Sequence, residues 1–467
     1  MNEGVFRAGV GRVDITPPLT APHASWGAQV HVLPDGVETN LWATALVVDD
    51  GTTVAAWIDL DVVIITREQN DAIRETVGAA LGIPALNVRV SVTHNHAGPP
   101  PSTWNWTKQG QAALDGYFGL LPEYAAGAAR VAFNTIKPAR IAVGKGESRV
   151  AINRREDGPN GRTVTGVNFD GIMDPHVFVA RIDGVDSTPI AAIVGYTMHP
   201  TTMGPSNRSI SADWPGYLKR TVEQLTGATC FFAQGATGDV GPGPEGFTDR
   251  FEVIRKLGAM VGCEAARAYF DLNLPAVSYR HERVWESGAP LSVWRADPVE
   301  EAPVVVKVAS RQAKLSLIDL PSLADAQSGA DAAQQNLDSL NAANAPKHEI
   351  EAATFVAKRS YMTLSRVQTY GGKTHSEVEL HLLQIGPAVI VGTEGEPFCE
   401  IGIDIKARSP FPGTWFGGYT SGWSGYIPTA SEYPRRGYEV DISPFAPSAA
   451  SELTEAAVAA LIELSDS

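Results

Sequence analysis

Two histidines, His94 and His96, follow an alternating run of apolar and polar residues in the segment LNVRVSVTHNHAGPPP. The valines at 88, 90 and 92 predict a half-buried strand, and continued alternation would place both imidazoles on one face where the strand ends. The glycine and prolines that follow stop the strand. Two imidazoles in this arrangement are typical of a metal site or an acid–base pair, although such a pair can also be purely structural.

Three other segments share this order of apolar strand and polar residue. The run 190–198 ends at His199, AVIVGT ends in EGEP, whose second glutamate is Glu396, and GTWFG leads into a glycine-rich aromatic loop that contains Tyr426. The glycine in EGEP lets the backbone approach a ligand closely. Taken singly, each feature also has a structural explanation. His199 could be a hydrogen-bonded polar residue beside a proline, EGEP a solvated turn, and the aromatic loop a packing element.

The shared position at the ends of strands favours one common site. In open α/β sheets the ligand crevice lies at the carboxyl ends of the strands, so residues far apart in sequence can converge there. Two neutral imidazoles and a carboxylate form a catalytic zinc ligand set that leaves a position for water. Zinc lowers the pKa of such a water from about 15.7 towards 7. The sequence therefore predicts a Zn²⁺-dependent hydrolase.

A second glycine-rich loop occurs in FFAQGATGDVGPGPEG. It lacks the lysine of a phosphate-binding loop and the spacing of a dinucleotide fingerprint, and the chain has no GxSxG segment for a serine hydrolase. The loop is better suited to present backbone amides to a substrate or an oxyanion. Asp239 in this loop could orient it or accept a proton, and a structural cap is an equal alternative.

Short β-branched runs alternate with helical patterns, which predicts an α/β fold with helices around a mostly buried sheet. Helices are expected near the ranges 66–82, 122–136, 213–226, 249–271 and 449–464. The Ala-, Gln- and Asn-rich segment 322–368, broken around Pro346, predicts an inserted helical hairpin that shapes an oligomer contact or a pocket rim. The segment 285–310 gives no clear prediction.

Composition limits the classes of partner. The 467 residues carry a net charge of −15 at 44% hydrophobic and 19% charged content, which favours a globular protein and disfavours nucleic acid or stable binding to anionic membranes. Three cysteines in no metal-binding spacing fit a reducing compartment. No signal peptide or membrane-spanning run is apparent, so a cytoplasmic location is expected.

Taken together, the motifs resemble the catalytic domain of the neutral/alkaline non-lysosomal ceramidase family. The resemblance extends from AGVGRVDITPP to GYIPTASEY and GYE, and includes WIDLD, THNHAGP, MHPTTMGPSNRSISADWPGY, FAQGATGDVGP and GEPFCEIG. It covers nearly the whole chain, so we expect one catalytic domain over residues 1–467. It implies an α/β fold of mixed β-sheets flanked by helices.

The resemblance also implies roles for individual residues. The family's zinc ligands fall on His94, His199, Glu396 and Tyr426. His96 matches the family's substrate or oxyanion histidine. A tyrosine twelve residues beyond the ligand tyrosine, Tyr438, matches its hydrogen-bond donor to the transition state.

Three departures separate this chain from the lipid-cleaving members. Their catalytic loop contains a serine where this chain has Gly241, so a serine role cannot be transferred. A C-terminal immunoglobulin-like domain and a secretory signal are also expected to be absent. We therefore expect hydrolysis of an amide or ester bond in a small polar substrate by a metal-activated water, rather than cleavage of long-chain ceramide.

Other residues and functions remain open at this point. Arg154 could bind a substrate carboxylate or hydroxyl, or form a surface ion pair. Four tryptophans beside the motifs could line a pocket or pack in the core: Trp26, Trp104, Trp106 and Trp423. Alternative functions are a metal-dependent glycosidase or lyase acting on a polar ring, and a non-catalytic binding protein. The partners expected are a small-molecule substrate and, as an open alternative to a monomer, further copies of the chain.

Overall fold

The computed structural model describes residues 5–467 except 24, 30, 102–107 and 301. Its largest sheet has eight strands in the order β12-β10-β9-β6-β1-β3-β4-β5. The strands are β1 Arg7–Asp14, β3 Trp42–Asp49, β4 Val54–Leu60, β5 Val88–Val92, β6 Lys137–Glu147, β9 His176–Gly184, β10 Pro189–Tyr196 and β12 Thr229–Gln234. The pairs β4–β5 and β10–β12 are parallel and the other neighbours in this sheet are antiparallel, so the sheet is mixed as expected.

The eight-stranded sheet folds back on itself. Strands β1 and β6 pair only through Arg7 with Pro138 and Ala8 with Lys137, and the sheet bends at this short join. Its first strand, β12, reaches β4 near the other end of the sheet, since the backbone N–H of Phe232 in β12 donates to Asp59 of β4 at 3.1 Å. The bend therefore brings the carboxyl ends of β5, β10 and β12 to one end of the molecule.

A second sheet completes the core. Its order is β16-β17-β18-β20, with bounds Val306–Ser316, His375–Ile385, Ala388–Thr393 and Gly413–Gly417. The indole of Trp415 in β20 lies against β10, and its Nε1 donates to the carbonyl of Ala233 at 3.1 Å. A Cβ at position 195 would approach the Trp415 ring to 2.5 Å, so only glycine fits there. The two sheets thus pack face to face around apolar residues of both.

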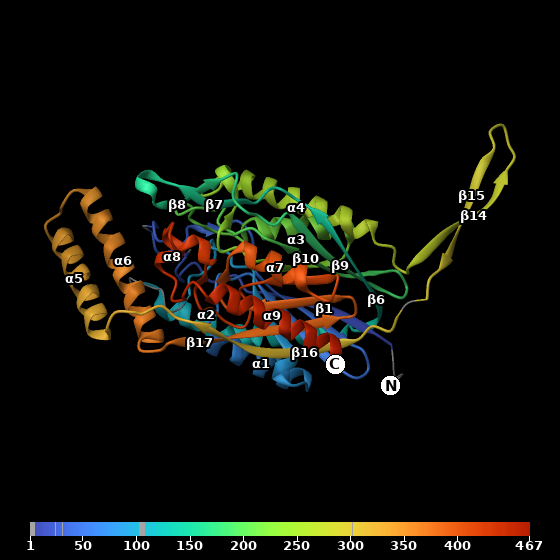
Figure 1. Cartoon of the computed structure of the whole chain (residues 1–467), viewed down its shortest axis with the longest axis horizontal. Helices are drawn as coiled ribbons and strands as arrows, with labels where there is room; N and C mark the ends of the chain where they lie inside the picture. Colours follow the sequence, from blue (N-terminus) through green and yellow to red (C-terminus); the bar gives the residue numbers. More distant parts are fainter. Residues whose placement is uncertain (1–4, 24, 30, 102–107, 301) are drawn as a thin grey trace.

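Helices cover the outer faces of the sheets (Figure 1). The longer helices are α1 Arg67–Leu81, α2 Gln111–Asn134, α3 Asp213–Thr226, α4 Phe251–Asp271, α7 Cys399–Arg408 and α9 Ala449–Asp466. The N-terminus of α1 is a capping box, in which Thr66 and Gln69 each bond the other's backbone N–H, and Gly82 ends it in the left-handed region with φ 69°. Five predicted helices are confirmed, with α4 starting two residues late.

The start of α2 was wrongly expected near residue 122. The helix begins at Gln111, and Pro122 lies inside it. Leu114, Phe118 and Leu121 pack into the core at the spacing of one helical face. Proline is common at helix starts, but burial of this apolar face extends the helix well upstream of the proline.

Two hairpins project from opposite ends of the molecule (Figure 1). The predicted helical hairpin is confirmed as α5 Leu323–Ala342 and α6 Lys347–Tyr370. The segment 285–310, which gave no clear prediction, contains β15 Leu291–Pro298, and β15 pairs with β14 Val277–Trp285 just before the segment. Shorter strands are β7 Ile152–Asp157, β8 Thr163–Asn168, β13 Val240–Gly241, β19 Glu396–Pro397, β21 Tyr426–Ile427 and the β2–β11 pair at Gly36–Val37 and Ser209–Ile210, and the short helix α8 is Tyr438–Asp441.

A helix that crosses a bilayer must be both long and strongly apolar. Across the described ranges, no helix combines the two properties to the extent that a membrane span needs.

Candidate metal centre

The predicted site residues come together at the end of the molecule where β5, β10 and β18 finish. His94 and His96 follow β5, His199 follows β10, and Glu396 follows β18. The Nε2 atoms of His94 and His199 are 3.0 Å apart, and that of His96 is 3.2 Å from each of them. His94 and His199 are each 1% exposed. Three imidazoles from two strand ends therefore meet in one buried cluster.

The ring orientation of each histidine is set by a backbone carbonyl. The Nδ1 atoms of His94, His96 and His199 lie 2.8–3.1 Å from the carbonyl oxygens of Val63, Ser25 and Thr237. A carbonyl oxygen only accepts, so each Nδ1 carries the proton and each neutral Nε2 presents a lone pair. Three lone pairs at this separation repel one another without a cation between them. The cluster consequently fits a metal ion.

The spacing of these nitrogens also suits zinc. With Zn–N bonds of about 2.0–2.1 Å in a tetrahedron, ligand nitrogens lie roughly 3.3–3.4 Å apart, close to the 3.0–3.2 Å observed here. His94, His96 and His199 form the group of possible metal ligands found among the described residues. His96 was expected to contact substrate. Its Nε2 lies only 0.2 Å farther from the other two nitrogens than these lie from each other, so its position also suits a ligand.

Glu396 adds a carboxylate to the cluster. Its Oε2 lies 3.4 Å from His94 Nε2 and 3.8 Å from His199 Nε2, while Oε1 accepts from Trp423 Nε1 at 2.9 Å. Burial raises the pKa of Glu396, whereas the hydrogen bond from Trp423 and the charge of Arg154 lower it and favour the ionised form. The carboxylate is therefore ionised, and Trp423, expected to bind substrate, contacts this carboxylate.

Tyr426 pairs with Glu396 across the short strands β19 and β21 and is held by Arg154. The Arg154 Nη2 donates to the Tyr426 hydroxyl at 3.1 Å and to the Gly238 carbonyl at 2.8 Å, and its Nε lies 2.9 Å from Glu439 Oε1. Arg154 is 4% exposed, so the alternative that the sequence left open, a surface ion pair, is wrong. The buried guanidinium instead positions the predicted ligand tyrosine.

Tyr438 stands closer to the surface than Tyr426. It begins α8, its ring centroid is 5.9 Å from that of Tyr426 at 73°, and it is 37% exposed. Burial of the hydroxyl, together with the charge of Glu396, raises the pKa of Tyr438. Its hydroxyl therefore stays protonated at neutral pH and can donate a hydrogen bond to a reacting group.

The loop after β12 packs directly under Glu396. Asp239 accepts from the backbone N–H of Cys399 at 2.7 Å and from Asn153 at 3.1 Å, and burial raises its pKa to about 7. The first of these bonds is to the first residue of α7, which favours the structural-cap alternative. A Cβ at Gly238 would approach the Glu396 carbonyl to 2.6 Å, so glycine permits this close packing.

One residue near the histidines, Tyr419, received no role from the sequence. Its ring stacks on His94 at 4.1 Å between centroids, and its hydroxyl bonds Thr237 at 2.6 Å and lies 3.4 Å from Glu396 Oε2. Tyr419 and His94 both have positive φ, 61° and 63°, which non-glycine residues adopt at an energetic cost, often at functional sites. The sequence signal for Tyr419 was its place in the glycine-rich loop region. Nothing in the sequence distinguished it there from the other aromatic residues, Trp423, Tyr426, Tyr433 and Tyr438.

Of the four tryptophans, Trp26 lies next to His96 with ring centroids 5.3 Å apart. Its indole also donates to the Met203 carbonyl at 3.2 Å. Trp104 and Trp106 lie outside the described residues. Trp26 therefore lines the side of the cluster on which His96 lies.

Comparison with known proteins identifies a family for the chain and supports its fold. The family model described as neutral/alkaline non-lysosomal ceramidase, N-terminal, matches residues 6–250, which include all three histidines and the loop after β12. The chain belongs to this ceramidase family. Neutral ceramidase A of Dictyostelium discoideum is 28% identical over 269 residues, 53% of this chain but 37% of that protein.

Relatives of this ceramidase-family chain also match at greater length. Neutral ceramidase of Pseudomonas aeruginosa is 21% identical over 473 residues, covering 93% of this chain and 68% of the relative. A solved ceramidase complexed with C2 has a TM-score of 0.67 at 17% identity, over 99% of this chain and 76% of its own. This structural likeness confirms the expected α/β architecture.

Proposed function

We propose that this protein is a zinc-dependent hydrolase that cleaves an amide or ester bond of a small polar substrate. The observation that carries the proposal is the convergence of three imidazole lone pairs, two of which lie within 3.8 Å of a buried carboxylate. Nitrogen and oxygen ligands in this number suit zinc. A bound Zn²⁺ would supply Lewis acidity and an activated water at neutral pH.

The chain's own residues would orient this chemistry. Trp423 and Tyr419 hold the Glu396 carboxylate, and Arg154 holds the Tyr426 hydroxyl. Tyr438 keeps its proton and, being partly exposed, can donate to an oxyanion that develops on a substrate carbonyl. His94, His199, Glu396 and Tyr426 are the proposed ligands, and His96 acts as the substrate histidine or as a further ligand.

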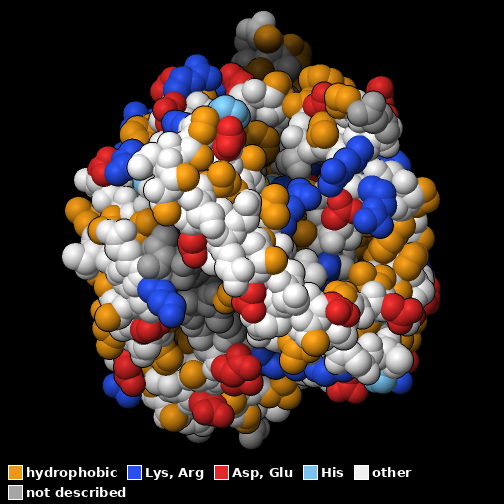
Figure 2. Space-filling view, turned by 90° about the vertical axis from the view of Figure 1, so that its left-hand side faces the viewer, with side chains coloured by type: hydrophobic (Ala, Val, Ile, Leu, Met, Phe, Trp, Pro, Cys, Tyr) orange, Lys and Arg blue, Asp and Glu red, His pale blue; other side chains and the backbone are white. Residues whose placement is uncertain are grey.

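Basic side chains at α8, here called the rim, support a substrate with an anionic group. Arg162 and Arg436 share one carboxylate, Asp441, at 3.0 and 2.9 Å, and line a cavity of about 460 Å³ with Arg435. Figure 2 looks at the end of the molecule that carries α8 and shows Lys and Arg side chains gathered beside a hollow. Ceramide carries no charge that these guanidinium groups could pair with, whereas a carboxylate or phosphate would match them.

Substrate preference is the direct test of the proposed function. Zinc-loaded protein should turn over small amides, esters or lactones that carry a carboxylate or phosphate, with little turnover of long-chain ceramide in detergent. Arg162→Ala/Arg436→Ala should raise the KM for the anionic substrate by roughly 10-fold or more with little change in kcat, since the rim binds rather than reacts. Efficient ceramide hydrolysis by the unchanged protein would refute the substrate assignment.

Oxygen-18 water distinguishes the alternative reaction classes in the same assay. Amide or ester hydrolysis must place one solvent oxygen in the acid product. A lyase would place none there, and a glycosidase would place it on a sugar carbon. Absence of turnover across the whole panel, with metal bound, would favour a binding protein.

Phenylalanine substitutions should separate the two tyrosines. Tyr426→Phe removes a proposed ligand oxygen and should weaken zinc binding measurably, while the ring keeps its packing and the melting temperature of the metal-free protein stays nearly unchanged. Tyr438→Phe should leave zinc content unchanged and lower kcat and kcat/KM together by roughly 100-fold, as for a donor used in the transition state. Equal zinc affinity in Tyr426→Phe and wild type would exclude Tyr426 as a ligand.

Gly241→Ser restores the serine of the lipid-cleaving relatives. A Cβ at this position would meet Arg154 Cβ and Cδ at 3.7 Å, which is ordinary contact, so the variant should fold with a melting temperature near that of wild type. If the missing serine limits ceramide cleavage, the substitution should raise activity on short-chain ceramide relative to wild type. Gly241→Ala is the matched control, because it adds the Cβ without the hydroxyl.

A further inference from the structure

The strand pair β14–β15, here called the ribbon, stands away from the rest of the molecule. All residues of both strands are described, and none of them is buried. Tyr279, Trp285 and Trp294 are 59–62% exposed, and Leu291 is 48% exposed. An isolated two-stranded hairpin is marginally stable in water, so a ribbon with this many exposed aromatic side chains needs a surface to pack on.

The position of the ribbon argues against a role at the candidate metal centre. Figure 1 shows the ribbon at the opposite end of the molecule from α8, whose first residue is Tyr438. The ribbon therefore cannot cover the site of its own chain. A lipid surface bound by its tip would likewise hold the site away from the membrane.

A matching surface lies on the same chain, along the edge strand β16. Its pairing with β17 uses one side of the strand only. On the other side, Asp50 bonds the backbone N–H of Val306 at 2.7 Å and Glu452 bonds that of Ser316 at 2.7 Å. Between these two ends, the outward backbone groups of every second residue make no hydrogen bond within the described part of the chain: Val308, Ser310, Gln312 and Lys314.

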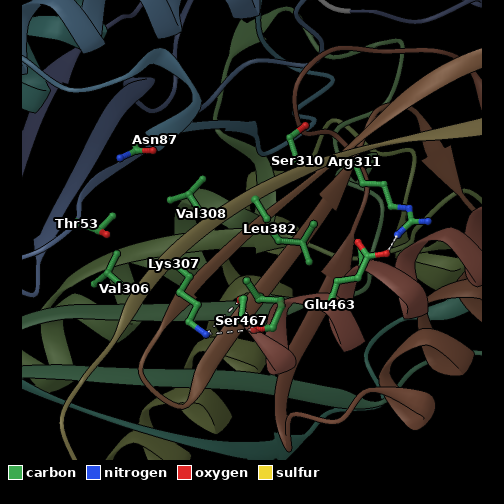
Figure 3. A pocket seen from close by; sticks show the side chains of 13 residues that line it. Thr53, Asn87, Val306, Lys307, Val308, Ser310, Arg311, Leu382, Glu463 and Ser467 are labelled. Atoms are coloured by element: carbon green, nitrogen blue, oxygen red, sulfur yellow. Dashed lines mark hydrogen bonds and ion pairs between the residues drawn. The ribbon is translucent and has the colours of Figure 1, made fainter.

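This open edge borders a groove. A cavity of about 550 Å³ runs along residues 306–311 and is bounded by Thr53 and Asn87 on one side and by the end of α9 on the other. Figure 3 shows Val308 and Ser310 of β16 along it, with Lys307 and Arg311 beside the last turn of α9. An edge strand with unpaired N–H and C=O groups is a template for a further strand.

We propose a two-fold dimer in which the ribbon of each copy pairs, as an added strand, with the β16 edge of the other copy. In such a dimer each subunit uses the same two surfaces, its ribbon and its β16 edge, as a closed two-fold dimer requires. Glu282 and Glu286 near the ribbon tip, which have no ion pair in the described ranges, would face Lys307 and Lys314, whereas Arg311 already pairs with Glu463.

The area available is sufficient for a stable dimer. Aromatic side chains bury about 150–250 Å² each, so three that are 59–62% exposed offer roughly 300–400 Å² on one ribbon. Because each subunit would contribute a ribbon and receive one, this approaches the ~800 Å² per partner of specific interfaces. The proposal does not depend on the proposed catalytic function.

The test is the mass of the full chain in solution. Wild type should sediment as a dimer, and Trp285→Ser/Trp294→Ser should raise the dissociation constant by at least about 100-fold. Gln312→Pro, which removes one outward N–H of the receiving edge, should weaken the dimer too. Phe169→Ser removes an aromatic side chain that is 76% exposed elsewhere and should leave the dimer intact.

Hydrogen exchange locates the contact. The amides of Val308, Ser310, Gln312 and Lys314 should be protected in wild type and should exchange faster in the double tryptophan variant. A monomeric wild type, a dimer that survives the tryptophan substitutions, or unprotected β16 amides would each overturn the proposal. Co-sedimentation of a monomeric wild type with phosphatidylcholine vesicles, lost in the tryptophan variant, would overturn it in favour of a lipid surface.

Discussion

Replacement of His199 by alanine should remove the bound metal and lower kcat/KM by more than about 100-fold, with His94→Ala giving the same result. Each substitution removes one of three lone pairs that converge at 3.0–3.2 Å. The melting temperatures should be compared between metal-free proteins, because a ligand that binds the folded state raises the apparent stability. In that comparison both variants should lie close to wild type.

Metal content of the folded proteins is the deciding measurement. His176→Ala is a suitable control, since this histidine is half exposed and pairs with Asp174. Wild-type metal content in both His94→Ala and His199→Ala would exclude the proposed centre.

His96→Ala separates the two roles open to the third histidine. Loss of rate with metal retained would identify it as the substrate histidine, as expected from the family resemblance. Loss of both would make it a ligand, as its distance of 3.2 Å from the other two nitrogens allows.

Lys219→Met should strongly destabilise the fold. Lys219 on α3 lies 2.6 Å from Asp61 and 3.4 Å from Asp59, and all three side chains are at most 5% exposed. Removal of the ammonium leaves two buried carboxylates without a cation, which costs about 3–5 kcal/mol. Urea unfolding at neutral pH measures the loss. A change as small as that in Lys137→Met, which breaks an exposed pair with Asp186, would contradict the expectation.

The loss should shrink as the pH falls. In wild type, burial already raises the pKa of Asp59 to about 6 despite Lys219. Without the lysine the pKa of Asp59 should rise further, so the folded state would bind more protons than the unfolded state near neutral pH. Stability of Lys219→Met should therefore increase from pH 7 towards pH 5. A pH-independent difference from wild type would show that the carboxylates are not the cause.

Local sequence patterns determined where the main candidate ligands lie. His94, His199 and Glu396 were predicted at the ends of apolar strands, and each does follow one, β5, β10 and β18. Side-chain alternation and the prolines that stop each strand are properties of a few consecutive residues. The helical hairpin was predictable for the same reason, since composition and the break at Pro346 act locally.

Which of these strand ends meet was decided only by the tertiary structure. The bend at the short β1–β6 join and the packing of β18 against the larger sheet place Glu396 within 3.4 Å of His94. Burial likewise decided the role of Arg154, which its sequence neighbours do not reveal. The proximity of His96 to both other histidines, and the stacking of Tyr419 on His94, arise from contacts between segments far apart along the chain.

The sequence by itself thus determined the residue types, their places at strand ends and the resemblance to one family. The tertiary structure decided their convergence, the proton positions on the histidines and the open edge of β16. The physical reason is that periodicity and turn chemistry act over a few residues. Lone-pair geometry, burial and strand pairing instead depend on partners contributed by distant parts of the chain.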